Sequence, residues 1–159
     1  MRKLTLILVV FLLLTFAFSC SLVGPSTASL QVEAQIIYKI GGPQPVARET
    51  LLLLDTDIDK LPETQEALKD AQGELLIHKL KRINFFLNDG RNLLESHKVQ
   101  SGQTDFKGQV TFENIKPGEY WVFGIAETRS EMKPMVWNVR TTVKAGENKL
   151  ALSNDNEGF

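Results

Sequence analysis

The stretch TDFKGQVTFENIKPGEYWV, residues 104–122, decides the fold. Its first turn centres on Asp105 and Gly108, because an Asp side chain accepts hydrogen bonds from a turn backbone and glycine adopts angles that other residues resist. Pro117-Gly118 marks a second turn. The residues between the two turns alternate between apolar and polar, which is the two-residue period of a half-buried strand. The stretch therefore predicts consecutive strands joined by tight turns.

Strand patterns continue on both sides of this stretch. Upstream, residues 30–38 alternate strictly, and residues 50–54 form a short apolar run. Downstream, turn residues separate three more apolar segments at residues 119–127, 136–144 and 149–153. Short strands at this spacing are typical of a sandwich or a barrel. We therefore expect a mainly β fold, an antiparallel sandwich of seven strands.

A helical segment interrupts the strands. From residue 61 to about residue 87 the apolar residues recur at steps of three and four, which is the period of a helix with one apolar side. Pro62 suits the first helical turn, and Asn88-Asp89-Gly90 suits the end. We expect a helical insertion at about residues 60–97 that packs on the sandwich. The apolar stripe expected to face the sheet comprises Leu68, Leu75, Leu80, Ile83 and Leu87.

The central stretch resembles the signature of carboxypeptidase regulatory-like domains. That family has a prealbumin-like β-sandwich and looks similar to collagen-adhesin B-type repeats. Its pattern is Thr-Asp, two residues, glycine, an alternating strand, and then Pro-Gly-x-Tyr at the start of the next strand. The resemblance implies a prealbumin-like sandwich over residues 29–55 and 98–153, and it leaves function open because this fold serves many unrelated tasks. The matching positions are Thr104, Asp105, Gly108, Val110, Phe112, Ile115, Pro117, Gly118 and Tyr120.

The first twenty residues have neither the strand pattern nor the helix pattern of the rest of the chain. Arg2 and Lys3 precede an apolar run over residues 4–18, which is shorter than the roughly 20 residues that a membrane-spanning helix needs. A basic start, a short apolar core and small residues near its end are typical of a cleavable export signal, here residues 1–19. We therefore expect the mature chain to begin outside the cytoplasm.

Cys20, the only cysteine, follows Ala17-Phe18-Ser19. This arrangement resembles the lipobox of bacterial lipoproteins, which implies that a fatty acid such as palmitate is attached to Cys20. The alternative is an ordinary signal peptide with an incidental cysteine, although a lone thiol in an oxidising compartment has no disulfide partner within the chain. Ser21 resembles the residue at this position in outer-membrane lipoproteins. We expect a lipid-anchored envelope protein at the outer membrane, facing the periplasm or the cell surface.

The expected domain organisation follows from these segments. Residues 20–28 form a lipidated tether, residues 29–153 form the sandwich with its helical insertion, and residues 154–159 form a C-terminal tail. The formal net charge is −1, so the chain has no basic excess with which to bind nucleic acid.

No residue pattern indicates catalysis, a cofactor or a metal. His78 and His97, the only histidines, have no acidic or cysteine partner at ligand spacing. Residues 55–66 place acidic side chains at several positions of a calcium-binding loop, but Lys60 stands where such a loop needs glycine. A strand end followed by a helix start explains these acids better. We expect a chain that is not an enzyme and holds no metal.

The segment at residues 119–127 is apolar on both faces. One face belongs to the sandwich core, and the other must be covered by the helix, a partner or a ligand. We take Trp121, Phe123 and Trp137 as a candidate interaction surface. The first hypothesis is a non-catalytic envelope lipoprotein whose sandwich is a structural or protein-interaction module with an envelope protein partner. The alternative is a carbohydrate-binding module that stacks sugars on these rings.

Overall fold

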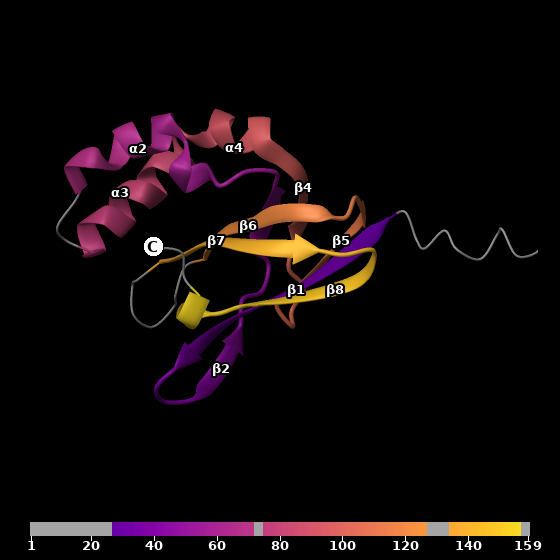
Figure 1. The fold of residues 1–159 in the computed structure, drawn as a ribbon. Coiled ribbons are helices and arrows are strands. Elements are labelled where there is room, and N and C mark those ends of the chain that lie inside the picture. Colours follow the sequence, from indigo (N-terminus) through magenta and orange to yellow (C-terminus); the bar gives the residue numbers. More distant parts are fainter. Residues whose placement is uncertain (1–26, 72–74, 127–133, 157–159) are drawn as a thin grey trace, which may run out of the picture.

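A computed structural model describes residues 27–71, 75–126 and 134–156. They form two β-sheets with a layer of helices on one of them (Figure 1). The predicted lipid attachment residue Cys20 and the predicted export signal lie outside the described residues. Among the described residues, none of the helices is both long enough and apolar enough to cross a membrane.

The first sheet is built around its longest strand, β1 (Ala28–Tyr38). Strand β5 (Gln109–Ile115) pairs antiparallel with the first half of β1, and β2 (Gly42–Pro45) pairs antiparallel with the second half. Strand β8 (Gly146–Leu152) pairs with β1 in parallel. Within the segment assigned to the C-terminal tail, the side chain of Asn154 continues this edge, since it accepts from the Ile37 amide and donates to the Ile37 carbonyl oxygen.

The second sheet is antiparallel throughout, and its order is β4-β3-β6-β7. The mainly β sandwich with a helical insertion is therefore confirmed. The described residues form eight strands rather than seven, because residues 42–45 form a short strand in addition to a turn. The sandwich is also not wholly antiparallel as expected, since β8 pairs with β1 in parallel. The strands of this sheet are β3 (Thr50–Leu54), β4 (Lys98–Gln103), β6 (Gly118–Ala126) and β7 (Met135–Val143).

The turn that opens β5 has the geometry that its sequence predicts. The carboxylate Oδ1 of Asp105 accepts hydrogen bonds from the amides of Lys107 and Gln109, each at 2.8 Å. Gly108 has a φ of +76°, and a Cβ built there would lie 2.3 Å from the carbonyl oxygen of Ala34. Only glycine fits both the backbone angle and the close approach to β1, so this turn fixes how the β4–β5 connection meets the first sheet.

The space between the sheets is filled by one continuous core. Its side chains come from alternate positions of β1, β3, β5, β6, β7 and β8, as the two-residue period requires. The fully buried members with the largest side chains include Trp137, Phe112, Leu30, Leu51, Leu53 and Leu152.

The helical insertion lies between β3 and β4 in the chain and over the second sheet in space (Figure 1). The single long helix expected from residue 61 to 87 is instead divided, and residues 72–74 lie outside the described part. Helix α4 follows the predicted helix end at Asn88-Asp89-Gly90 and lies within the predicted insertion. The helical elements are the 3-10 turn η1 (Ile58–Lys60), α2 (Pro62–Leu68), the 3-10 turn η2 (Lys69–Ala71), α3 (Leu75–Leu87) and α4 (Arg91–His97); a last turn, η3 (Asn154–Asn156), follows β8.

Replacing Tyr120 by alanine should destabilise the domain strongly. The Tyr120 ring is buried in the inter-sheet core, and its hydroxyl donates to the carbonyl oxygen of Lys116 at 2.8 Å. We expect a loss of about 3–5 kcal/mol in the free energy of unfolding for Tyr120→Ala, and about 1 kcal/mol for Tyr120→Phe, which removes only the hydrogen bond. Urea unfolding of both variants checks this, and equal losses would contradict it.

Candidate functional site

The outer face of the second sheet carries two of the three aromatic residues singled out from the sequence. Phe123 is 3% exposed, and its ring meets the Phe86 ring of α3 edge-on at a centroid distance of 5.1 Å. Trp121 is half-buried against the same cluster, with the Arg140 guanidinium carbon 5.9 Å from its ring centroid. The helices therefore cover nearly all of Phe123 and part of Trp121.

Trp137 lies on the other side of the sheet. It is fully buried between the two sheets, and its indole N–H donates to the carbonyl oxygen of Ser153 at 2.9 Å. In β7 it stands opposite Gly124, where a Cβ would lie 2.4 Å from the Leu51 side chain, so the glycine leaves room for Leu51 beside the indole. Trp137 therefore does not join Trp121 and Phe123 in one surface. The sequence contained a signal for this, because the polar residues Asn138 and Arg140 alternate with Trp137 and mark the outer face.

A second apolar cluster forms between this sheet and the helices. It is separate from the inter-sheet core, and Phe86 and Ile83 contribute to it from α3. Large aromatic side chains bury about 150–250 Å² each, worth several kcal/mol at ~25 cal/mol per Å² before ordering costs. The buried members are Leu54, Ile58, Ile83, Phe86, Leu94, Phe123 and Val136.

The face that α3 turns to the sheet is the predicted one only in part. Ile83 of the predicted stripe is buried there, together with Arg82 and Phe86 from outside it, whereas Leu80 and Leu87 of the stripe are exposed. The predicted stripe consists of apolar residues alone, whereas the face that the structure buries includes the charged residue Arg82. The structure buries that face because Arg82 has a partner beneath it.

That partner belongs to a polar clamp of Asp57, Asp59, Arg82 and Asn138. The Arg82 side chain is 3% exposed and binds Asp59 with two hydrogen bonds, Nε to Oδ1 at 2.8 Å and Nη2 to Oδ2 at 2.6 Å. Asn138, from β7, donates through Nδ2 to Asp59 Oδ2 at 2.7 Å and to Asp57 Oδ1 at 2.8 Å. The clamp joins α3, the η1 turn and the second sheet at one point.

The clamp also explains the alternating acids that resembled a calcium loop. Asp57 and Asp59 have Lys60, Arg82 and Asn138 as partners, and Asp55 lies 3.0 Å from Nδ1 of His97. Among residues 27–71, 75–126 and 134–156, no group of three or more His, Cys, Asp or Glu side chains is placed to hold a metal ion.

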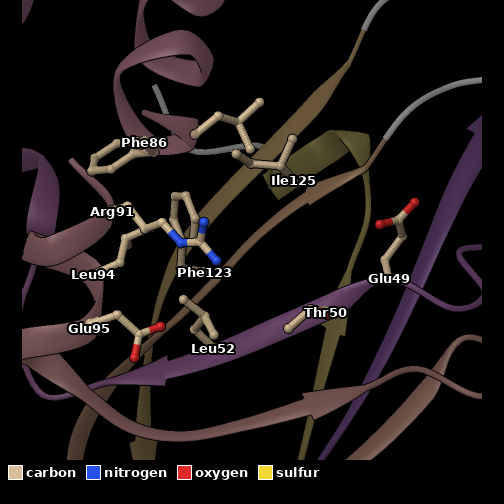
Figure 2. Close-up of a pocket in the computed structure, with 10 residues that line it drawn as sticks. Glu49, Thr50, Leu52, Phe86, Arg91, Leu94, Glu95, Phe123 and Ile125 are labelled. Carbon is tan, nitrogen blue, oxygen red and sulfur yellow. The ribbon is translucent and has the colours of Figure 1, made fainter. Parts of the chain in front are cut away.

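Beside the clamped helices, an open groove of about 450 Å³ remains between α3, α4 and the second sheet (Figure 2). Its apolar floor comes from Leu52, Phe123 and Ile125, whereas charged side chains stand at its rim, with Glu49 on the side opposite α4. Such a groove suits apolar side chains of a partner, with polar contacts at the edge. The helices contribute Phe86, Leu87, Arg91, Leu94 and Glu95, and β3 contributes Thr50.

No family model matches this chain, and no curated protein matches it. Solved structures do match. A candidate carbohydrate-binding protein from Pseudomonas aeruginosa has 13% identity and a TM-score of 0.46, over 86% of this chain and 94% of that one. The minor pilin of Streptococcus agalactiae has 12% identity and a TM-score of 0.43, over 82% of this chain and 45% of the pilin.

The shaft pilin of Lactobacillus rhamnosus GG has 12% identity and a TM-score of 0.39, over 80% of this chain and 49% of the pilin. This chain thus spans about half of each pilin. At these identities and scores the likeness carries no conclusion about function. The resemblance to carboxypeptidase regulatory-like domains stays a prediction from the residues of the central stretch.

Removing one member of the clamp should loosen the helical layer. Arg82→Met leaves the Asp59 carboxylate without its bidentate partner, and breaking such a buried pair costs about 3–5 kcal/mol, or less here because the Asp59 side chain is 31% exposed. We expect roughly 2–3 kcal/mol in urea unfolding. The control is Lys60→Met, because the Lys60 side chain is 81% exposed and its ion pair with Asp57 contributes only about 0–1 kcal/mol. Equal effects of the two changes would contradict the clamp.

Proposed function

We propose that this chain is a non-catalytic, lipid-anchored protein of the cell envelope whose sandwich serves as a structural or protein-interaction module. The observation that carries the proposal is that the helices cover only part of the outer face of the second sheet. The helical insertion covers Phe123, and what it leaves open is an apolar groove with a charged rim. A groove of this kind suits a macromolecular partner better than a reacting small molecule.

The lining of the groove supports a non-catalytic role. Among the described residues that form it are two glutamates and one arginine, and Thr50 contributes a hydroxyl, but no histidine, cysteine or serine is present. Nucleophilic catalysis needs a nucleophile within hydrogen-bonding reach of a base. In the groove, Glu95 instead pairs with Lys98.

The carbohydrate alternative has less support. It requires a solvent-facing row of rings, but Phe123 and Trp137 are buried and Trp121 is half-buried. Phe106, at the β4–β5 turn, is an exposed ring, and one ring in a turn is not such a row.

The lipid anchor is tested at Cys20. We expect Cys20→Ser to abolish incorporation of a fatty-acid analogue and to leave the protein unprocessed or unanchored, because the acylated sulfur is lost. The parent chain expressed in parallel is the positive control. Undiminished label in the variant would overturn the anchor.

The interaction role is tested from within the groove. A photoreactive phenylalanine analogue at Thr50, at the groove mouth, should give a defined cross-linked protein in intact cells. The matched control is the same analogue at Thr111, which is exposed on β5 in the other sheet. Equal cross-linking from both positions, or none from Thr50, would contradict the groove as the partner site.

A further inference from the structure

Helix α3 has an apolar side that nothing among the described residues covers. Leu76, Ile77, Leu80 and Leu87 are 42–60% exposed, and we call these four side chains the outer α3 face. Leu76, Leu80 and Leu87 follow at spacings of four and seven, so they form one stripe roughly 16 Å long at 1.5 Å per residue. The stripe ends at the groove, which Leu87 also lines.

This face needs a cover. A helix at the surface of a globular protein normally has one apolar side and one polar side, and α3 already buries Ile83 and Phe86 against the sheet. Contiguous exposed apolar side chains on a soluble domain usually mark a surface that meets a protein or a membrane.

The charges beside the outer α3 face favour an anionic lipid surface. No acidic residue occurs from residue 75 to residue 87, and Lys81 lies exposed next to Leu80. Near the end of the stripe, the exposed cation Arg91 has the exposed acid Asp89 close to it in the chain, so Lys81 carries the favourable charge. Exposed apolar side chains beside a cation, on a helix without acidic residues, are typical of helices that lie in the membrane interface.

The proposed lipid anchor makes this contact geometrically possible. Eight residue steps lead from Cys20 to Ala28, where β1 begins, and they span at most about 26–29 Å. The helix axes lie two layer spacings from the sheet of β1, or about 20 Å at ~10 Å each, and the radius of a helix adds about 5 Å. The tether is therefore just long enough for the helical layer to lie on the membrane that holds Cys20.

We propose that the outer α3 face lies on the lipid surface of this membrane as an interfacial helix, so that the domain is held by two contacts. The proposal rests on the lipid anchor of the proposed function. An acyl chain keeps the domain at high local concentration beside the bilayer, so a weak second contact suffices to orient it.

The test measures depth at one residue of the full-length, lipid-anchored protein in vesicles of phosphatidylcholine and phosphatidylglycerol. A lipid on Cys20 leaves the parent chain without a free thiol, so Leu80→Cys takes a single environment-sensitive fluorophore. Ile40→Cys is the matched control, since Ile40 is almost fully exposed at the β1–β2 hairpin. We expect blue-shifted emission at position 80, quenching there by nitroxide lipids, and quenching by iodide several-fold weaker than at position 40.

Two further variants test whether the apolar side chains of the outer α3 face make the membrane contact. Leu76→Ser with Leu87→Ser should abolish nitroxide quenching at position 80, whereas Val99→Ser, an exposed apolar residue of β4, should leave it unchanged. Iodide quenching at position 80 equal to that at position 40 would overturn the proposal. A second outcome would also overturn the proposal: a blue shift at position 80 that grows with the ratio of protein to lipid, without quenching by nitroxide lipids. That result would mean that a second copy of this chain covers the outer α3 face.

Failure of the anchor is recognised separately. Label on the parent chain would show a free Cys20 and overturn the lipid anchor. The depth at position 80 is then measured in a Cys20→Ser background, where its result still decides for or against the membrane contact of α3.

Discussion

The two apolar faces of β6 are the constraint on which the rest of the structure depends. An antiparallel strand in a sandwich needs one apolar face, but β6 directs Tyr120 and Val122 into the inter-sheet core and Phe123 and Ile125 outward. The outward face is stable only under a further layer. The insertion between β3 and β4 supplies it, and the second apolar cluster makes the helices part of the same folded unit.

Apolar contact alone does not fix how a helix lies on a sheet, because burial is not directional. The bidentate bond between Arg82 and Asp59, with Asn138 beside it, supplies the direction. It turns α3 so that Phe86 meets Phe123. The same rotation exposes Leu80 and Leu87, so the interaction that orders the helical layer also creates the face that we assign to the membrane.

The sequence predicted the elements that a local residue pattern defines. It did not predict features that depend on contacts between residues distant in the chain. Alternation identified β1 and the strands that follow the Asp105 turn, and the helical period identified the insertion. The side of α3 that is buried depends on Asp59, 23 residues away, and β2 depends on pairing with β1. The place of Trp137 followed from strand register, which its alternation with Asn138 and Arg140 would have indicated.

Native-state hydrogen exchange tests most directly whether the helical layer and the sandwich form one unit. If they do, the amides of residues 83–86 in α3 and those of β6 open with the same free energy. Phe86→Ala should then lower both values by the same amount, because the two segments share the ring contact between Phe86 and Phe123. Rapid exchange in α3 beside an undisturbed, protected β6 would contradict the account.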